Sequence, residues 1–263
     1  MLKREFIVNF KNFLIWTGLL IGMFLVVFMV YPSIMSSEQS GDINEMMKMF
    51  PPELLKAFNM DIAGIDTAFG WLKTEGFVFV LLITGVYSSI LGSNILLKEE
   101  SDKTIEYLNS LPVTRKKIVI EKIIVSVTYI ILIIVITGVF NYLALKGAED
   151  FDRKQFVLLS LTPIFSSLTL YAVSLFISTF AHKTKKVFGI SLGLVFVSYF
   201  LNTIAQMSEK TEFLKFFSAF TLADVRNVIT DVTINPVMVG IAFILFTAFS
   251  FLAIIHYEIK ELV

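Results

Sequence analysis

Six long apolar stretches, separated by shorter polar segments, dominate the pattern of this chain. Approximately, they cover residues 13–35, 77–97, 123–145, 155–181, 187–207 and 237–255. An α-helix rises about 1.5 Å per residue, so roughly 20 apolar residues cross a hydrocarbon core of about 30 Å. Each stretch is long enough for one crossing, and almost none carries a charge inside. The pattern therefore predicts an all-α, polytopic membrane protein with six transmembrane helices.

The stretches are hydrophobic on every side, unlike the amphipathic helices of a soluble domain. Of all residues 56% are hydrophobic, and the mean hydropathy is +0.79. Backbone groups in lipid have to be satisfied within their own segment, so each span should be a helix, and the alternating pattern of a membrane β-barrel is absent. The chain has no cysteine, which excludes disulfides and thiol chemistry. The first stretch is too long for a typical signal peptide and predicts an uncleaved span.

The formal net charge of zero conceals an asymmetry between two sets of loops. One set, with 13 Lys or Arg and 8 Asp or Glu, comprises residues 1–12, 98–122, 182–186 and 256–263. The other set, with 9 Lys or Arg and 14 Asp or Glu, comprises residues 36–76, 146–154 and 208–236. Because Lys and Arg concentrate in cytoplasmic loops, the first set predicts the inner side of the cell membrane. Six crossings then place both termini in the cytoplasm.

The segment 2–11, which precedes the first stretch, has a pattern of its own. Leu2, Phe6 and Phe10 recur every four residues with Lys and Arg between them, which predicts a short helix lying on the inner membrane surface. A simple basic flank that orients the first span is the alternative. Among the outer loops, 36–76 predicts short amphipathic helices on the rim, and 208–236 predicts a partly re-entrant segment.

The charged segment 98–122 lies between the second and third stretches. Ser101 or Asp102 can cap a short helix that Pro112 ends, and Thr114 can cap the next helix, which runs into the third span. One face of the short helix is apolar and carries Ile105, Leu108 and Leu111, with Tyr107 at its edge. So small an apolar face cannot form its own core. It has to lie on the membrane or in the groove of a partner.

This loop resembles that of the permease subunit of bacterial ABC-2-type ABC transporters. In that family an acidic pair is followed by Gly-Thr-x-Glu, by a Leu-Ser-Leu-Pro-Val-Ser-Arg-like run, and by a basic residue that enters the third span. The matching residues here are Glu99, Glu100, Thr104, Glu106, Leu108, Ser110, Leu111, Pro112, Val113, Thr114, Arg115 and Lys122. Lys103 stands where the family usually has Gly, and Glu121 where a Gly often precedes the basic residue. The six spans and the amphipathic start match too, so the resemblance covers nearly the whole chain.

The resemblance implies an exporter driven by a separate ATPase that holds ATP and Mg²⁺, with no cofactor in this chain. The loop helix would be a coupling helix that docks on the ATPase, and 2–11 would be an elbow helix at the same interface. The permease would work as a dimer of identical or different copies. The residues assigned to ATPase coupling are Glu99, Glu100, Thr104, Ile105, Glu106, Tyr107, Leu108, Leu111, Pro112 and Arg115.

Two glycine pairs, Gly18 with Gly22 and Gly189 with Gly193, match the close-packing motif of membrane helices. In the resembled family these spans lie near the dimer interface, which makes the four glycines candidates for dimer packing. The alternative is that glycine is simply common in membrane spans.

The chain lacks the sequence motifs of several function classes. The chain has no P-loop motif, so it is not expected to bind ATP by one, and no mid-span acid marks an ion-coupled carrier. The pair Glu99–Glu100 resembles one class of intramembrane metalloprotease but lies at the membrane edge with no matching histidine. No metal site and no nucleic-acid partner are expected.

A non-transport membrane scaffold or sensor remains the alternative to a permease. The 27 Phe favour amphipathic or hydrophobic cargo, such as a peptide, a lantibiotic-type antimicrobial or a drug.

Overall fold

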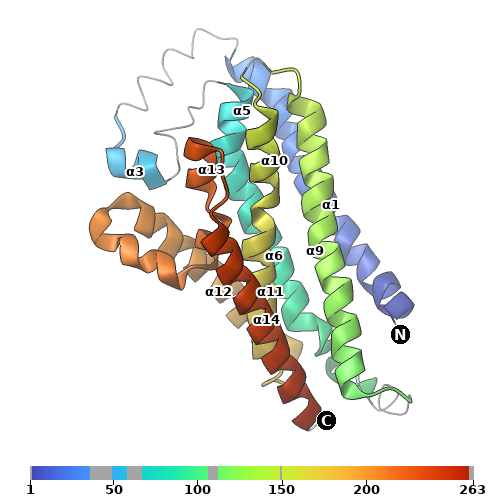
Figure 1. Cartoon of the computed structure of the whole chain (residues 1–263). Helices are drawn as coiled ribbons and strands as arrows, with labels where there is room; N and C mark the ends of the chain where they lie inside the picture. The colour runs from blue at the N-terminus through green and yellow to red at the C-terminus, as the bar shows by residue number, and fades with distance from the viewer. Residues whose placement is uncertain (1, 36–48, 58–66, 106–111, 149, 261–263) are drawn as a thin grey trace.

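A computed structural model describes residues 2–35, 49–57, 67–105, 112–148 and 150–260. Every regular element in these ranges is helical. By length and composition, the candidate membrane spans there are Leu2–Met29, Ala68–Ile95, Arg115–Leu145, Arg153–Ser178, Thr184–Met207 and Pro236–Ile259. The prediction of an all-helical chain with six candidate membrane-spanning helices is thereby confirmed. Figure 1 shows these helices gathered into one elongated bundle.

Four of the six candidate spans start at a capping side chain, namely Thr67, Thr114, Asp152 or Asn235. The helices that make them are α1 (Leu2–Met35), α5 (Ala68–Trp71), α6 (Phe77–Ile95), α9 (Arg115–Leu145), α10 (Arg153–Leu161), α11 (Pro163–Ser178), α12 (Thr184–Met207) and α14 (Pro236–Ile259). Thr114 caps α9 as predicted, because its Oγ1 accepts a hydrogen bond from the backbone N–H of Lys117 at 3.3 Å. Asp152 caps α10 in the same way, at 3.1 Å from the N–H of Gln155. The third helix therefore begins at residue 115, before the apolar stretch at 123.

The second span also starts earlier than its apolar stretch. Thr67 caps α5, and a π-helical turn, η1 (Leu72–Gly76), joins α5 to α6. In the loop that precedes this span, α3 (Pro52–Ala57) begins with a proline at its first position, where the missing N–H costs nothing. The rest of that loop, at 36–48 and 58–66, lies outside the described residues.

Helices α6 and α11 form the buried centre of the bundle. Small residues line their contact. A Cβ added to Gly92 would lie 2.4 Å from the carbonyl oxygen of Tyr171, so the two backbones meet there closely. Nearby, the hydroxyls of Ser89 and Ser174 are 2.6 Å apart, and Ser89 also donates to the carbonyl of Ser191 on α12 at 3.0 Å. Close packing and interhelical hydrogen bonds are the forces that join helices within lipid.

The other helices surround this centre. Helix α1 packs on α9, α12 packs on α6, and α14 packs on α11 and α9. Their outer faces carry exposed apolar side chains, among them Val26, Val139, Val197 and Phe243. Such faces are stable in contact with lipid tails and unstable in water, in agreement with a membrane location.

After α12 the chain turns back along the helix it has just left. The turn comprises the 3₁₀ helices η2 (Glu209–Phe217) and η3 (Ala219–Ala223), followed by α13 (Val225–Asp231). The hydroxyl of Ser218 donates to the carbonyl of Ser198 at 2.6 Å, although Ser198 lies nine residues before the end of α12. Nine helical residues span about 14 Å, so the segment folds back along α12 by about that length. Whether it re-enters the membrane stays a prediction.

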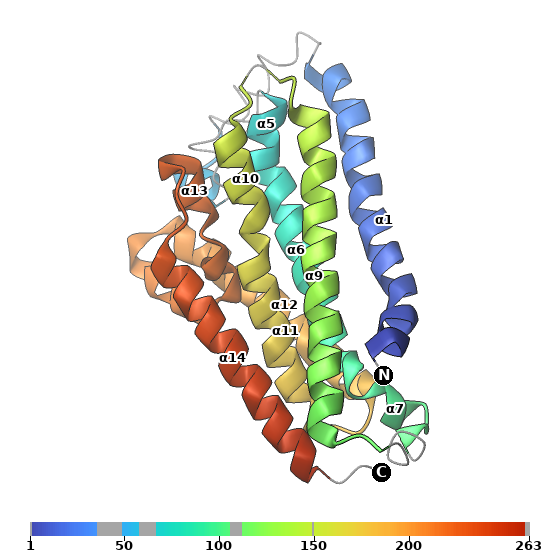
Figure 2. The ribbon, with the colours of Figure 1, turned by 45° about the vertical axis from the view of Figure 1, so that its right-hand side comes forward.

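Both ends of the described chain lie at the same end of the bundle as α7 (Lys98–Ser101), as Figure 2 shows. This agrees with the loop grouping derived from charge. Residues 2–11, in contrast, are not a separate helix: they form the first turns of the continuous α1. No Gly or Pro interrupts them, and Glu5, Asn9 and Phe13 bury one continuous face. Whether these turns lie on the membrane surface stays a prediction.

Candidate functional site

The candidate site lies where the chain leaves α6 and re-enters the bundle as α9. Helix α7 follows α6 almost directly, and the N–H of Thr104 then bonds the carbonyl of Glu99 at 2.8 Å, closing a tight turn. Within this turn Lys103 has φ of 56°, a left-handed conformation that favours glycine. The lysine thus occupies the position where the resembled family usually has Gly. Ile105 follows and is buried.

Lys122 and Glu99 form the centre of a buried group of charges. The Nζ of Lys122 donates to both carboxylate oxygens of Glu99, at 2.8 and 3.0 Å, and to the carbonyl of Ile95 at 2.6 Å. Both side chains are at least 97% buried. An unpaired charge at this depth would be costly, and the three contacts compensate it.

Glu5 joins α1 to this pair. Its carboxylate accepts a hydrogen bond from Lys98 Nζ at 2.6 Å, and it lies 3.6 Å from Lys122 Nζ. Near it, the hydroxyl of Tyr129 donates to the carbonyl of Phe6 at 2.6 Å, and the two rings meet edge to face. The start of α1 is therefore bonded to both sides of the loop, at α7 and at α9.

Glu100 extends the group toward the end of the chain. Its carboxylate lies 2.6 Å from Lys260 Nζ and 2.9 Å from Nδ1 of His182. Lys260 also donates to the carbonyl of Ala181. Here we call Glu5, Lys98, Glu99, Glu100, Lys122, His182 and Lys260 the basal charge cluster. Its three carboxylates balance its three ammonium groups.

Two further contacts fasten the neighbouring helices. Arg115 Nη1 donates to the backbone carbonyls of Glu258, at 3.2 Å, and Lys260, at 2.8 Å. These are carbonyls at the end of α14, where a cation also faces the negative end of the helix dipole. On the other side, Ser101 Oγ accepts from the N–H of Thr184 at 3.2 Å, at the start of α12. The loop base is thus bonded to α1, α9, α12, the residue that follows α14, and the connection that follows α11.

The structure places the predicted coupling residues in three ways. Glu99, Glu100 and Ile105 are buried inside the protein, whereas Thr104 and Pro112 are exposed and Arg115 is half-buried. Glu106, Tyr107, Leu108 and Leu111 lie outside the described residues. Of the elbow residues, Phe6 packs on Tyr129, and Leu2 and Phe10 are exposed.

The glycine pairs lie on uncovered surfaces. A Cβ added to any of the four would meet no atom within 4 Å, at Gly18, Gly22, Gly189 or Gly193. They therefore pack against nothing in the described part of one chain. Their role in a dimer stays a prediction.

Sequence reasoning missed part of the cluster. It named Lys122 only as the basic residue that enters the third span, without predicting a buried partner for it, and it gave no site role to Lys98 or His182. One signal could have found Lys122: it lies seven residues into a helix that continues into an apolar stretch, and such a charge needs a buried partner. Lys260 and Glu5 carried no comparable signal.

A comparison with protein families gives one match, to the family described as ABC-2 family transporter protein, over residues 1–262. In the same comparisons, neither a curated protein nor a solved structure matches the chain.

Proposed function

Since the chain belongs to the ABC-2 family of transporter membrane proteins, we propose that it is the membrane subunit of an ATP-driven exporter, coupled to its ATPase through residues 98–122. Members of this family are membrane permeases rather than ATPases, and the family in general works with an ATPase partner. This membership also favours a permease over the scaffold or sensor considered from the sequence. Under this proposal ATP and Mg²⁺ bind to the partner.

The single observation that carries the coupling proposal is the basal charge cluster. Its ion pairs join the base of the loop, at Lys98, Glu99 and Glu100, to α1, α9 and the residue that follows α14. Breaking one buried pair leaves an uncompensated charge and costs about 3–5 kcal/mol. A push on the loop is therefore transmitted to the helices more readily than it is absorbed by separating these charges.

Within the loop we assign two different roles. The buried carboxylates Glu99 and Glu100 position the loop and do not touch the ATPase. Docking is the role of the apolar face predicted around Leu108, with Tyr107 and Leu111, which cannot form a core of its own. Pro112 is exposed and restricts the chain where it returns to the membrane.

We further propose that two permease copies, identical or different, form the transport pathway. The uncovered glycines of α1 and α12 support this, because small residues let helix backbones approach closely in lipid. Replacing both Gly189 and Gly193 with Leu should lower the dimer fraction measured by single-molecule photobleaching in nanodiscs. An unchanged fraction would remove α12 from the interface.

The cargo class follows from the apolar character of the spans. We propose an amphipathic or hydrophobic solute, such as a peptide, antimicrobial or drug, moved outward from a cytoplasmic-side entry with both termini in the cytoplasm. A reconstituted complex that prefers small hydrophilic ions would contradict this cargo class.

The coupling role is tested by Leu108→Asp, which places a charge on the docking face without altering a span. We expect normal membrane insertion and loss of ATPase copurification or of transport. Ser110→Asp is the matched control, since the same charge then lies on the opposite face of the predicted helix and should be tolerated. Wild-type transport by the Leu108→Asp variant would contradict the proposal.

A further inference from the structure

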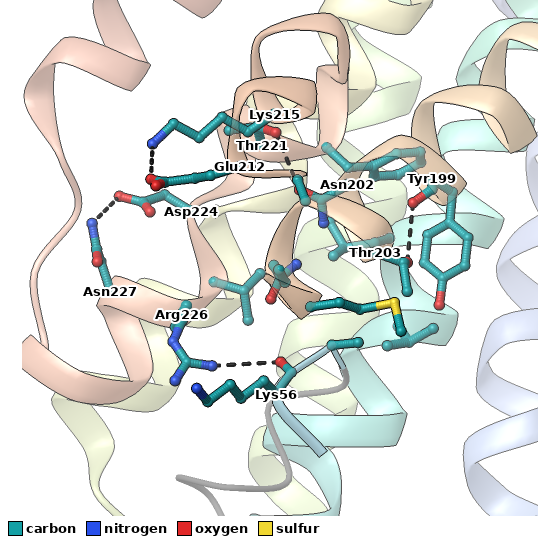
Figure 3. Close-up of a pocket in the computed structure, with 18 of the residues that line it drawn as sticks. Lys56, Tyr199, Asn202, Thr203, Glu212, Lys215, Thr221, Asp224, Arg226 and Asn227 are labelled. Carbon is teal, nitrogen blue, oxygen red and sulfur yellow. Dashed lines mark hydrogen bonds and ion pairs between the residues drawn. The ribbon is translucent and has the colours of Figure 1, made fainter. Parts of the chain in front are cut away.

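A cavity of about 490 Å³ lies at the end of the bundle opposite the basal charge cluster. It opens between the start of α6, the end of α12, the η2–η3 segment that folds back along α12, and α13 (Figure 3). Apolar side chains contribute to its wall, among them Phe77, Leu81, Phe220 and Met238. A few polar groups converge on the same space, a combination typical of ligand sites.

The charged groups around the cavity are unequally compensated. Lys215 is paired with Glu212, Arg226 donates to the backbone carbonyl of Lys56 at 3.5 Å, and Lys56 itself is exposed. Asp224 is half-buried, and its carboxylate accepts a hydrogen bond from the amide of Asn227 at 2.9 Å (Figure 3). Among the described residues no cation lies within ion-pairing distance of that carboxylate.

The burial of Asp224 shifts the pKa of its carboxyl group in a definite direction. Desolvation raises the pKa of its carboxyl group above the ordinary value, and hydrogen bonds from Asn227 and from the backbone of Asn235, together with the attraction of Lys215, oppose this rise only in part. The cavity wall therefore carries a half-buried carboxylate without an ion-pairing cation among the described residues. A ligand cation placed beside it would restore the stabilisation that water no longer provides.

The backbone holds Asp224 in place at a cost. Asp224 has φ of 46° and Val232 has φ of 52°, so both residues that bracket α13 are left-handed without being glycine. For the β-branched Val232 this conformation is a clear outlier. Strained residues persist where the surroundings determine them, and they cluster at functional sites.

An unpartnered acceptor lines the same cavity. The side-chain oxygen Oε1 of Gln206 is buried and has no hydrogen-bond partner among the described residues. Buried acceptors of this kind are uncommon in folded proteins, and each calls for an explanation. A rotation of this amide toward the cavity would bring the oxygen to a ligand N–H, which would supply the missing donor.

We propose that this cavity binds the cationic head of an amphipathic ligand, a primary ammonium carried on an apolar body. Asp224 provides the counter-charge, Gln206 Oε1 accepts an N–H, and the apolar body lies against Phe77, Leu81 and Phe220. This proposal narrows the cargo class of the proposed function. It depends on the proposed function only for the statement that the bound ligand is transported. A lysine-bearing amphipathic peptide and a long-chain alkylamine both present this chemistry.

The test uses the complete permease–ATPase complex in nanodiscs, without nucleotide. Its probes are monodansylated 1,12-diaminododecane, whose free amine is charged, and the N-acetyl derivative, which is neutral. We expect the wild type to bind the amine about tenfold more tightly than the acetylated probe, a difference of about 1.4 kcal/mol. Equal affinities for the two probes would overturn the proposal.

Variants locate the site. Asp224→Asn should weaken amine binding about tenfold and remove the preference for the charged probe. Asp102→Asn, a neutralised exposed carboxylate at the opposite end of the bundle, should change neither. If Asp224→Asn fails to fold, Gln206→Leu should still weaken binding of the amine and leave the acetylated probe unaffected; unchanged amine binding in Gln206→Leu would then overturn the proposal.

A second pair of probes separates the two ligand sources. A dansyl-labelled amphipathic peptide with one lysine, and the same peptide acetylated at that lysine, show whether a peptide or only an alkylamine is accepted. Retention of the ATPase is measured on the same samples. Loss of the charge preference in a complex that still holds its ATPase would overturn the cavity assignment alone, and loss of the ATPase would bear on the proposed function alone.

Discussion

The ammonium group of Lys122 and the carboxylate of Glu99 meet at 2.8 Å in a site that excludes solvent from both side chains. One residue belongs to the candidate membrane-spanning helix α9 and the other to the short helix α7, at the start of residues 98–122. The carbonyl of Ile95 takes a third bond from the same ammonium at 2.6 Å. Separating the loop base from α9 would leave a charge unpaired in an apolar interior, and this contact therefore holds the two together.

Replacing Lys122 with Met should strongly destabilise the protein. Glu99 and Glu5 would remain buried without their shared cation, at a cost of about 3–5 kcal/mol. Thermal unfolding in detergent measures the loss. Lys116→Met, an exposed cation on the first turn of the same helix, is the control and should change stability by less than about 0.5 kcal/mol.

Replacing Lys260 with Met should uncouple transport from ATP hydrolysis. Glu100 would lose its ammonium partner, and the loop would lose its bond to the residue that follows α14. We expect cargo transport per ATP hydrolysed to fall at least about fivefold in proteoliposomes, while the ATPase still copurifies. Lys186→Met alters an exposed cation in the first turn of α12 and should behave as the wild type. Equal coupling in both variants would show that the Lys260 contact has only a structural role.

Replacing Gly92 with Ala should separate the two central helices. The new Cβ would lie 2.4 Å from the carbonyl oxygen of Tyr171, so α6 and α11 would have to move apart, at about 1–3 kcal/mol. Gly240→Ala provides the contrast, because no atom lies within 4 Å of the added Cβ and a helical Gly-to-Ala change gains about 0.5–1 kcal/mol. Melting temperatures that move in the same direction for both would contradict this packing.

Replacing Lys103 with Gly should stabilise the loop base. A non-glycine residue at φ of 56° carries a penalty of about 1 kcal/mol, which glycine avoids. Asp102→Gly should instead destabilise the protein. Asp102 has φ of −88°, so a glycine there relieves no strain in the folded chain and only adds conformational freedom to the unfolded chain. Denaturation of the two variants in the same detergent compares them, and a stabilising Asp102→Gly would be the contrary outcome.

Much of the fold could be predicted from the sequence, because lipid imposes a simple requirement on it. Apolar stretches of about 20 residues can only cross as helices, so the six spans followed from the pattern. The cap at Thr114 followed as well, since it depends on residues three positions apart. The separate helix predicted at residues 2–11 is not observed, since these residues are part of α1. The continuous burial of Glu5, Asn9 and Phe13 outweighed the local amphipathic pattern.

The candidate site was harder to predict. The resemblance pointed to Glu99, Glu100 and Lys122, yet their pairing depends on contacts between residues far apart along the chain. Glu100 and Lys260 are separated by 160 residues, and no local period links them. The cavity opposite the basal charge cluster was equally hard to predict, since α3, α6, α12 and α13 meet there only through tertiary packing.

The central claim is that the loop at 98–122 docks on the ATPase, and the absence of cysteine in the chain allows a direct test. A single Leu108→Cys, paired with a cysteine-reactive bifunctional reagent in inside-out vesicles, should cross-link to the ATPase in a manner that changes on ATP addition. A cysteine at 110 should cross-link weakly. If the Leu108→Cys thiol reacted only with reagents applied from outside the cell, or never cross-linked to the ATPase, the coupling account would be contradicted.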